Sequence, residues 1–230
     1  MTILRLAILL PLLAQAIQVS AHEIESKADP AIDQAFDVTR AAATTNGKVT
    51  SFSLEVTGNA GSTVPEAIGA LKGAKAGAYV WPTDLDPAVA GFAGKSGILA
   101  LAVTAHPDFD DTPLYDENGD GDKANDGKTW HSHWVVLEKD PACTAGLKVR
   151  DVAPGKDMLP ATAPGLPLAL DSPNAVPALT ANKIELAMPL ANTEGASFDG
   201  VTAELQVNIK GEPPLLCVTK VHDVASGDLS

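Results

Sequence analysis

The chain has 230 residues, of which 45% are hydrophobic and 4% aromatic, and its formal net charge is -13. Such an acidic chain repels nucleic acid and anionic lipid, which excludes the classes of protein that bind them through charge. Its length and apolar content suit one hydrophobic core, so we expect a single domain.

Residues 1–21 have the pattern of a secretory signal peptide, with Arg5 before an apolar run and small residues before a cleavage site after Ala21. The run is short and interrupted by Gln15, so we expect no membrane span after cleavage, and a retained anchor is the less favoured alternative. The mature domain is then 22–230, periplasmic or secreted. Cleavage removes one of the 16 positive charges and none of the 29 negative ones, which leaves a net charge of -14.

Most of the mature chain has the two-residue periodicity of β-strands. Strands are expected over 35–44, 48–57, 78–81, 97–106, 129–138, 147–152, 184–188, 201–209 and 215–221. Asn46-Gly47 predicts a type I′ hairpin turn between the first two. The run 97–106 is apolar at nearly every position, as in a central strand buried on both faces. At most one or two short helical turns are expected, one over 65–72 and another within the loop 84–94.

Short strands joined by Pro- and Gly-rich connections predict an all-β, antiparallel β-sandwich, immunoglobulin-like or Greek-key, with a barrel as the alternative. Six prolines between 153 and 182 predict a long surface loop there. Cys143 and Cys217 are the only cysteines. In an oxidising compartment they are expected to form a disulfide, and two buried thiols are the alternative.

Three of the five histidines lie at the ends of one acidic segment. His131 and His133 are two residues apart on an expected strand, so their imidazoles leave the same face. If the strand that ends at His106 pairs with theirs, all three meet at one end of the sheet. Neutral imidazoles, with a carboxylate such as Asp108 or Asp110, suit copper or zinc. The alternative is that the histidines only form hydrogen bonds with nearby carboxylates.

The acidic segment also resembles the first half of a calcium loop, with alternating oxygen side chains and glycine at the sixth place. Its candidate ligands are Asp116, Asn118, Asp120 and Asp122. The twelfth place is glycine, so a full EF-hand is not supported. A shortened calcium site completed by Asp126 or Asp111 is one interpretation, and a solvated acidic turn is the other.

Signal cleavage would make His22 the amino terminus, where the α-amine and Nδ1 together chelate copper. Catalytic motifs are missing: the chain has no Gly-x-Ser-x-Gly, no phosphate loop and no His-Glu-x-x-His. Ser132 leaves its strand on the face opposite to His131 and His133, so it is not their nucleophile. We therefore favour a function without catalysis.

The sequence thus predicts an exported, non-catalytic metal-binding protein of the cell envelope, with a transition-metal site beside a calcium-like loop. One alternative is a calcium-stabilised recognition module that binds a protein or glycan partner through exposed tryptophans or the proline-rich loop. The second is a copper-dependent oxidase that uses His22. Native metal content separates the first two, because one predicts copper or zinc and the other only calcium.

Overall fold

The computed structural model describes residues 19–229, with gaps at 94–96, 118, 154, 156, 191–195 and 228. Within these residues, regular structure is almost entirely β, with only two short 3₁₀ turns, η1 (Pro87–Ala90) and η2 (Asp126–Lys128). The predicted signal peptide lies mostly outside the described residues. Across the described part of the chain, no helix has the length and apolarity needed to cross a membrane.

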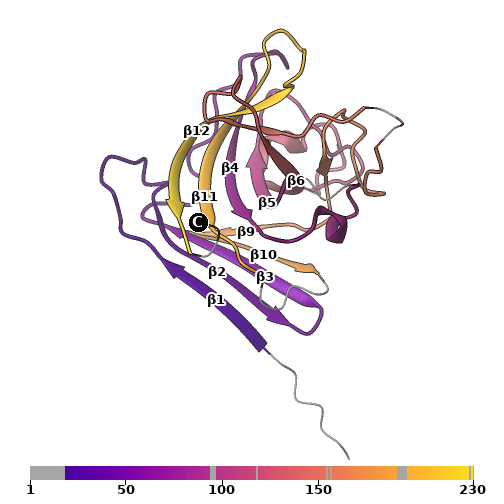
Figure 1. Cartoon of the computed structure of the whole chain (residues 1–230). Helices are drawn as coiled ribbons and strands as arrows, with labels where there is room; N and C mark the ends of the chain where they lie inside the picture. Colours follow the sequence, from indigo (N-terminus) through magenta and orange to yellow (C-terminus); the bar gives the residue numbers. More distant parts are fainter. Residues whose placement is uncertain are drawn as a thin grey trace, which may run out of the picture.

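The strands form two antiparallel sheets (Figure 1). The first has the order β1 (Val19–Glu25), β2 (Val38–Asn46), β3 (Val49–Val56), β10 (Lys183–Pro189), β9 (Ala178–Thr180). The second has the order β5 (Ile98–Ala105), β4 (Lys75–Pro82), β11 (Gly200–Val207), β12 (Leu216–Ala225), β7 (Leu147–Val149), β6 (His131–Lys139), β8 (Leu170–Asp171).

The second sheet closes on itself, because β5 pairs with β6 as well as with β4. The closed ring contains β4, β5, β6, β7, β12 and β11, and is a six-stranded barrel. The prediction of an all-β fold is confirmed, but the fold is not clearly a sandwich. Closure depends on pairings between strands distant in sequence, β4 with β11 and β7 with β12, which strand periodicity does not reveal.

The hydrophobic core has two parts, one on each side of the barrel wall. The outer part lies between the barrel and the five-stranded sheet and includes Tyr79, Trp81 and Leu101. The inner part lies inside the barrel and includes Ala102 and Leu205. Strand β5 contributes to both parts in alternation, which confirms the expectation of a strand buried on both faces.

Two local predictions were wrong. No helix forms over 65–72, where Gly69 has a φ of 75° that an α-helix does not allow. The β2–β3 hairpin exists, but its loop is Gly47-Lys48, and only Gly47 has a positive φ. A glycine with positive φ at the first loop position is the pattern of a type II′ turn rather than type I′.

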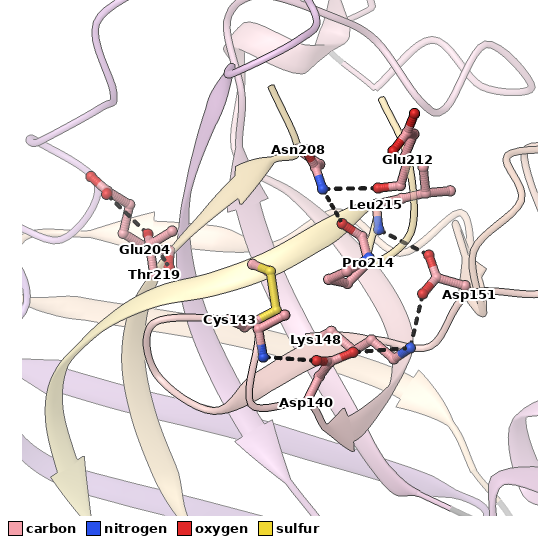
Figure 2. Close-up of a disulfide and its surroundings, with 12 residues drawn as sticks. Asp140, Cys143, Lys148, Asp151, Glu204, Asn208, Glu212, Pro214, Leu215 and Thr219 are labelled. Carbon is pink, nitrogen blue, oxygen red and sulfur yellow. Dashed lines mark hydrogen bonds and ion pairs between the residues drawn. A yellow bond between two sulfur atoms is a disulfide. The ribbon is translucent and has the colours of Figure 1, made fainter. Parts of the chain in front are cut away.

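The predicted disulfide between Cys143 and Cys217 is present, with a Cα–Cα distance of 5.3 Å (Figure 2). It joins the loop after β6 to β12, beside the place where β7 and β12 have a single registered pair, Lys148 with Cys217. Lys148 Nζ also lies 2.9 Å from Asp151, whose other oxygen accepts a hydrogen bond from Leu215 N. The disulfide therefore reinforces the seam at which the barrel pairs least.

Tyr79 ties the barrel to the loops beside the five-stranded sheet. Its hydroxyl donates to Ala35 O at 2.8 Å and accepts from Gly61 N at 2.7 Å, and its side chain is fully buried. Tyr79→Phe leaves both backbone groups without this partner, so we expect it to lower the free energy of unfolding by about 1–3 kcal/mol in urea titrations. The same change at Tyr115, in the loop between β5 and β6, should cost less than about 0.5 kcal/mol. Equal losses would contradict this role of the Tyr79 hydroxyl.

Candidate metal centre

The pairing of β5 with β6 places three histidines at one end of the barrel. In this register Thr104 lies opposite His131 and Ala102 opposite His133, and His106 directly follows β5. Residues directly opposite in an antiparallel pair share a face, so Thr104 and Ala102 lie on the same face as the two histidines of β6. The loop after His106 then brings Asp111 to the same place.

The four side chains form a compact, buried cluster. One ligand atom from each of His106, Asp111, His131 and His133 lies within 4.8 Å of the other three. The exposed fraction of each residue is 4% or less. Asp111 Oδ1 lies 3.1 Å from the Nε2 of His106 and 3.5 Å from the Nε2 atoms of both other histidines. Three imidazole nitrogens therefore surround one carboxylate oxygen.

The opposite ring nitrogen of each histidine is held by a group outside the cluster. His106 Nδ1 donates to Phe109 O at 2.7 Å, and His131 Nδ1 donates to Thr129 O at 2.9 Å. His133 Nδ1 lies 3.1 Å from Ser172 Oγ. A carbonyl oxygen only accepts, so Nδ1 carries the proton in His106 and His131. In their neutral forms both rings then point an Nε2 lone pair into the cluster.

These lone pairs are too close to be stable without a positive charge between them. The Nε2 atoms of His106 and His131 are 2.8 Å apart. Two acceptors at this distance repel each other unless a proton or a metal ion lies at the cluster. In addition, Asp111 Oδ1 and His133 Nε2 are buried without a partner in hydrogen-bonding geometry. Such buried polar atoms are costly when left unsatisfied.

Charge and burial set the protonation of the cluster. Burial by itself would raise the pKa of Asp111, but the neighbouring imidazoles of His133 and His106 outweigh it and hold the pKa well below its usual range. Burial lowers the pKa of His133 to about 3. Burial opposes protonation of His131 too, but Asp111 and Glu117 together raise its pKa. Metal binding requires an ionised Asp111 and three neutral imidazoles, so a metal ion would displace the proton that the raised pKa of His131 favours.

A second layer of carboxylates lies behind His131. Glu117 Oε2 is 3.6 Å from His131 Nδ1 and accepts a hydrogen bond from Thr112 Oγ1. Burial raises the pKa of Glu117 to about 7, against the attraction of His131. Asp126 is fully buried and accepts from Glu117 N at 2.9 Å. Asp126 thus holds the backbone of Glu117, and the Glu117 carboxylate increases the basicity of the His131 imidazole by its charge.

Asp108 and Asp110, the carboxylates that the sequence suggested, are used elsewhere. Asp108 accepts hydrogen bonds from Ile68 N and Gly69 N, and so fixes the loop before β4. Asp110 accepts from Thr112 N and from Asp126 N. The adjacent Asp111 is the carboxylate that reaches the histidines. The sequence predicted Asp111 only as a ligand that completes the calcium loop, and it did not predict Glu117 as a neighbour of His131.

The calcium-like loop is folded on its own side chains. Asp116 accepts from Asp120 N and Gly121 N, Asp120 accepts from Asp122 N, and Asp122 accepts from Ala124 N. Asn118 lies outside the described residues. Among the described residues, the His/Asp cluster is the one group of three or more metal-binding side chains. Calcium binding by this loop stays a prediction.

The other candidate groups lie apart from the cluster. His22 is on β1 opposite Ala43, and its ring contacts Phe198 at a centroid distance of 6.3 Å. Trp81 and Trp134 are buried in the core. Trp130 packs against Tyr79 and donates its Nε1–H to Gly61 O. The expectation of exposed tryptophans for partner recognition is therefore wrong for Trp81 and Trp134 and lacks support at Trp130.

Comparison of the chain with protein-family models, with curated proteins and with solved structures gives no match.

Proposed function

We propose that this chain is an exported, non-catalytic metal-binding protein of the cell envelope. Its buried cluster would hold one transition-metal ion through the Nε2 atoms of His106, His131 and His133 and a carboxylate oxygen of Asp111. The observation that carries the proposal is the convergence of these atoms, with two Nε2 atoms 2.8 Å apart and their Nδ1 protons directed outward. A cation at the centre would remove the repulsion between the lone pairs.

The ligand set favours zinc or copper. Three imidazoles and one carboxylate form a four-ligand nitrogen and oxygen site of the kind that Zn²⁺ and Cu²⁺ bind, whereas calcium prefers six to eight oxygens. The Ser132 hydroxyl donates to Ala175 O and so is not engaged with the histidines of the cluster. The disulfide fits an oxidising compartment, and export itself rests on the predicted signal peptide.

The test is metal analysis of the protein purified natively without chelators or affinity metals. We expect close to one equivalent of zinc or copper per chain, and uptake of one equivalent by chelator-treated protein. If the purified protein contains no transition metal and takes up none, the cluster holds a shared proton instead and the proposal fails. Calcium alone in the purified protein would favour the recognition-module alternative.

Asp111→Asn should weaken zinc binding on the order of 100-fold or more. A structural zinc site contributes about 10–16 kcal/mol in total, so each of four ligands accounts for roughly 3 kcal/mol. Competition titration against a chromogenic chelator measures this change. Asp108→Asn is the matched control, because Asp108 binds backbone N–H groups and not the histidines. The zinc affinity of this variant should stay within about threefold of that of wild type. If Asp108→Asn has the larger effect, the assignment of the carboxylate ligand is wrong.

A further inference from the structure

The inside of the barrel contains a cavity of about 570 Å³, within the range of ligand-binding pockets. Its wall is almost entirely apolar, with contributions from Val135, Leu137 and Leu205. A barrel of only six strands would ordinarily be filled by its own side chains. Here alanines occupy inward positions on three neighbouring strands, namely Ala76, Ala102 and Ala203, and their small side chains leave space.

The polar atoms of the cavity gather at the metal centre. Among the described residues, three buried side-chain atoms have no hydrogen-bond partner, namely Thr104 Oγ1, Asp111 Oδ1 and His133 Nε2. All three residues line this cavity. Thr104 lies opposite His131 in the strand register, so its hydroxyl belongs to the same end of the barrel. A metal ion would satisfy Asp111 Oδ1 and His133 Nε2, so the Thr104 hydroxyl is the orphaned atom left for the polar end of a ligand.

Four apolar side chains that line the cavity are exposed on the surface of the barrel. Leu71 is 53% exposed, Ile98 37%, Val221 40% and Val224 44%, and each lines the cavity. Lys72 also lines it, and its ammonium group donates to Lys210 O. Exposed apolar groups that surround one apolar cavity are the mark of a site that an apolar ligand covers.

We propose that the cavity binds an unbranched, medium-chain fatty acid, with its carboxylate at the metal ion and its alkyl chain along the barrel. The inference rests on the proposed metal site. A divalent ion beside the Asp111 carboxylate leaves one positive charge, which one further carboxylate neutralises. The Thr104 hydroxyl donates to the second oxygen of that carboxylate. From His133 to Leu137 the strand spans about 13 Å, enough for an extended chain of this class.

The alkyl chain and the head group make separate contributions to affinity. Each methylene transferred from water to the cavity should tighten binding by about fourfold, until the chain fills the barrel. The head group depends on the metal, because the ion supplies the positive charge that the fatty acid carboxylate binds. A neutral alcohol of equal chain length lacks this dependence.

Calorimetric titration with laurate and dodecanol tests the proposal on zinc-loaded protein freed of unbound zinc and on metal-free protein. Laurate should bind the zinc-loaded protein at least about tenfold more tightly than the metal-free protein, whereas dodecanol should bind both alike. With Co²⁺ in place of zinc, laurate and not dodecanol should change the visible absorption of the metal. Laurate affinity that is independent of metal, or equal to that of dodecanol, would overturn the head-group assignment.

Two substitutions separate the contribution of the alkyl chain to laurate affinity from that of the carboxylate head group. Ala102→Phe fills the cavity and should abolish laurate binding, while Thr104→Val removes one donor and should weaken it by about tenfold. Both should retain zinc, which shows that the site is folded, and Ala203→Phe repeats the first test from another strand. Wild-type protein that holds zinc but does not bind laurate refutes only this inference. Wild-type protein that takes up no zinc refutes the proposed function.

Discussion

Loading the metal-free protein with zinc should raise its melting temperature by roughly 8–16 °C. An ion that binds only the folded chain, at a concentration a thousand times its dissociation constant, stabilises it by about 4 kcal/mol. For a domain of 150–250 residues, each 1 kcal/mol changes the melting temperature by about 2–4 °C. The ion would also relieve the repulsion among buried lone pairs of His106, His131 and His133. Calorimetric scans of chelator-treated protein, with and without free zinc at about a thousand times its dissociation constant, measure the shift.

The control for this prediction is a variant with the double substitution His131→Ala and His133→Ala. It keeps the acidic loop and the disulfide but lacks two of the four ligands. Zinc should therefore change the melting temperature of this variant by less than about 2 °C. Sodium chloride at the same ionic strength should also have little effect on wild type. Equal stabilisation of wild type and the double variant by zinc would place the bound ion elsewhere on the acidic surface.

Removal of the disulfide should lower the free energy of unfolding by about 4 kcal/mol. Cys143 and Cys217 are separated by 74 residues, and the chain-entropy model gives about this value for a loop of that length. The folded state also depends on the bond, because β7 and β12 share one registered pair at this seam of the barrel. Urea unfolding of Cys143→Ser and of wild type, both freed of metal, measures the difference.

Cys217→Ser and the double substitution provide the matched controls. Each breaks the same bond, so all three variants should lose similar stability, and the double variant should not lose the sum of the two. Wild type under a thiol reductant should approach the variants. A loss below about 1 kcal/mol would mean that strand pairing and the ion pairs of Lys148 hold the seam without the disulfide.

The strands were largely predictable because their side chains alternate between two environments. Along β11, Ala203 and Leu205 face the barrel interior while Thr202 faces the other way, where its hydroxyl donates to Phe36 O. Closure of the barrel was not predictable in the same way. It depends on which distant edges pair, and the alternation along β5 is the same whether its partners form an open sheet or a ring.

The site was predictable where it lies on strands and not where it lies on loops. The spacing of His131 and His133 fixes their common face, and the end of β5 places His106 beside them. The carboxylate comes from a loop in which Asp108, Asp110 and Asp111 follow closely. Which of them faces the histidines is decided by the N–H groups that the other two bind.

The sequence pattern of the acidic loop fits two different structures. Alternating aspartates and glycines place oxygens around a calcium ion, but they also cap the backbone N–H groups of consecutive turns. Asp116, Asp120 and Asp122 all accept such bonds here. The same residues in the same spacing satisfy both structures, so local sequence does not distinguish them.

X-ray absorption at the metal edge of the loaded protein tests the central claim most directly. The account predicts a first shell of three imidazole nitrogens and one carboxylate oxygen at about 2.0–2.2 Å, with the outer-ring scattering that marks histidine. Loss of one imidazole nitrogen from this shell in His133→Ala would identify His133 as a ligand. A shell of six or more oxygens, or one with fewer than three imidazoles in the wild-type protein, would contradict the assignment of the metal centre to His106, Asp111, His131 and His133.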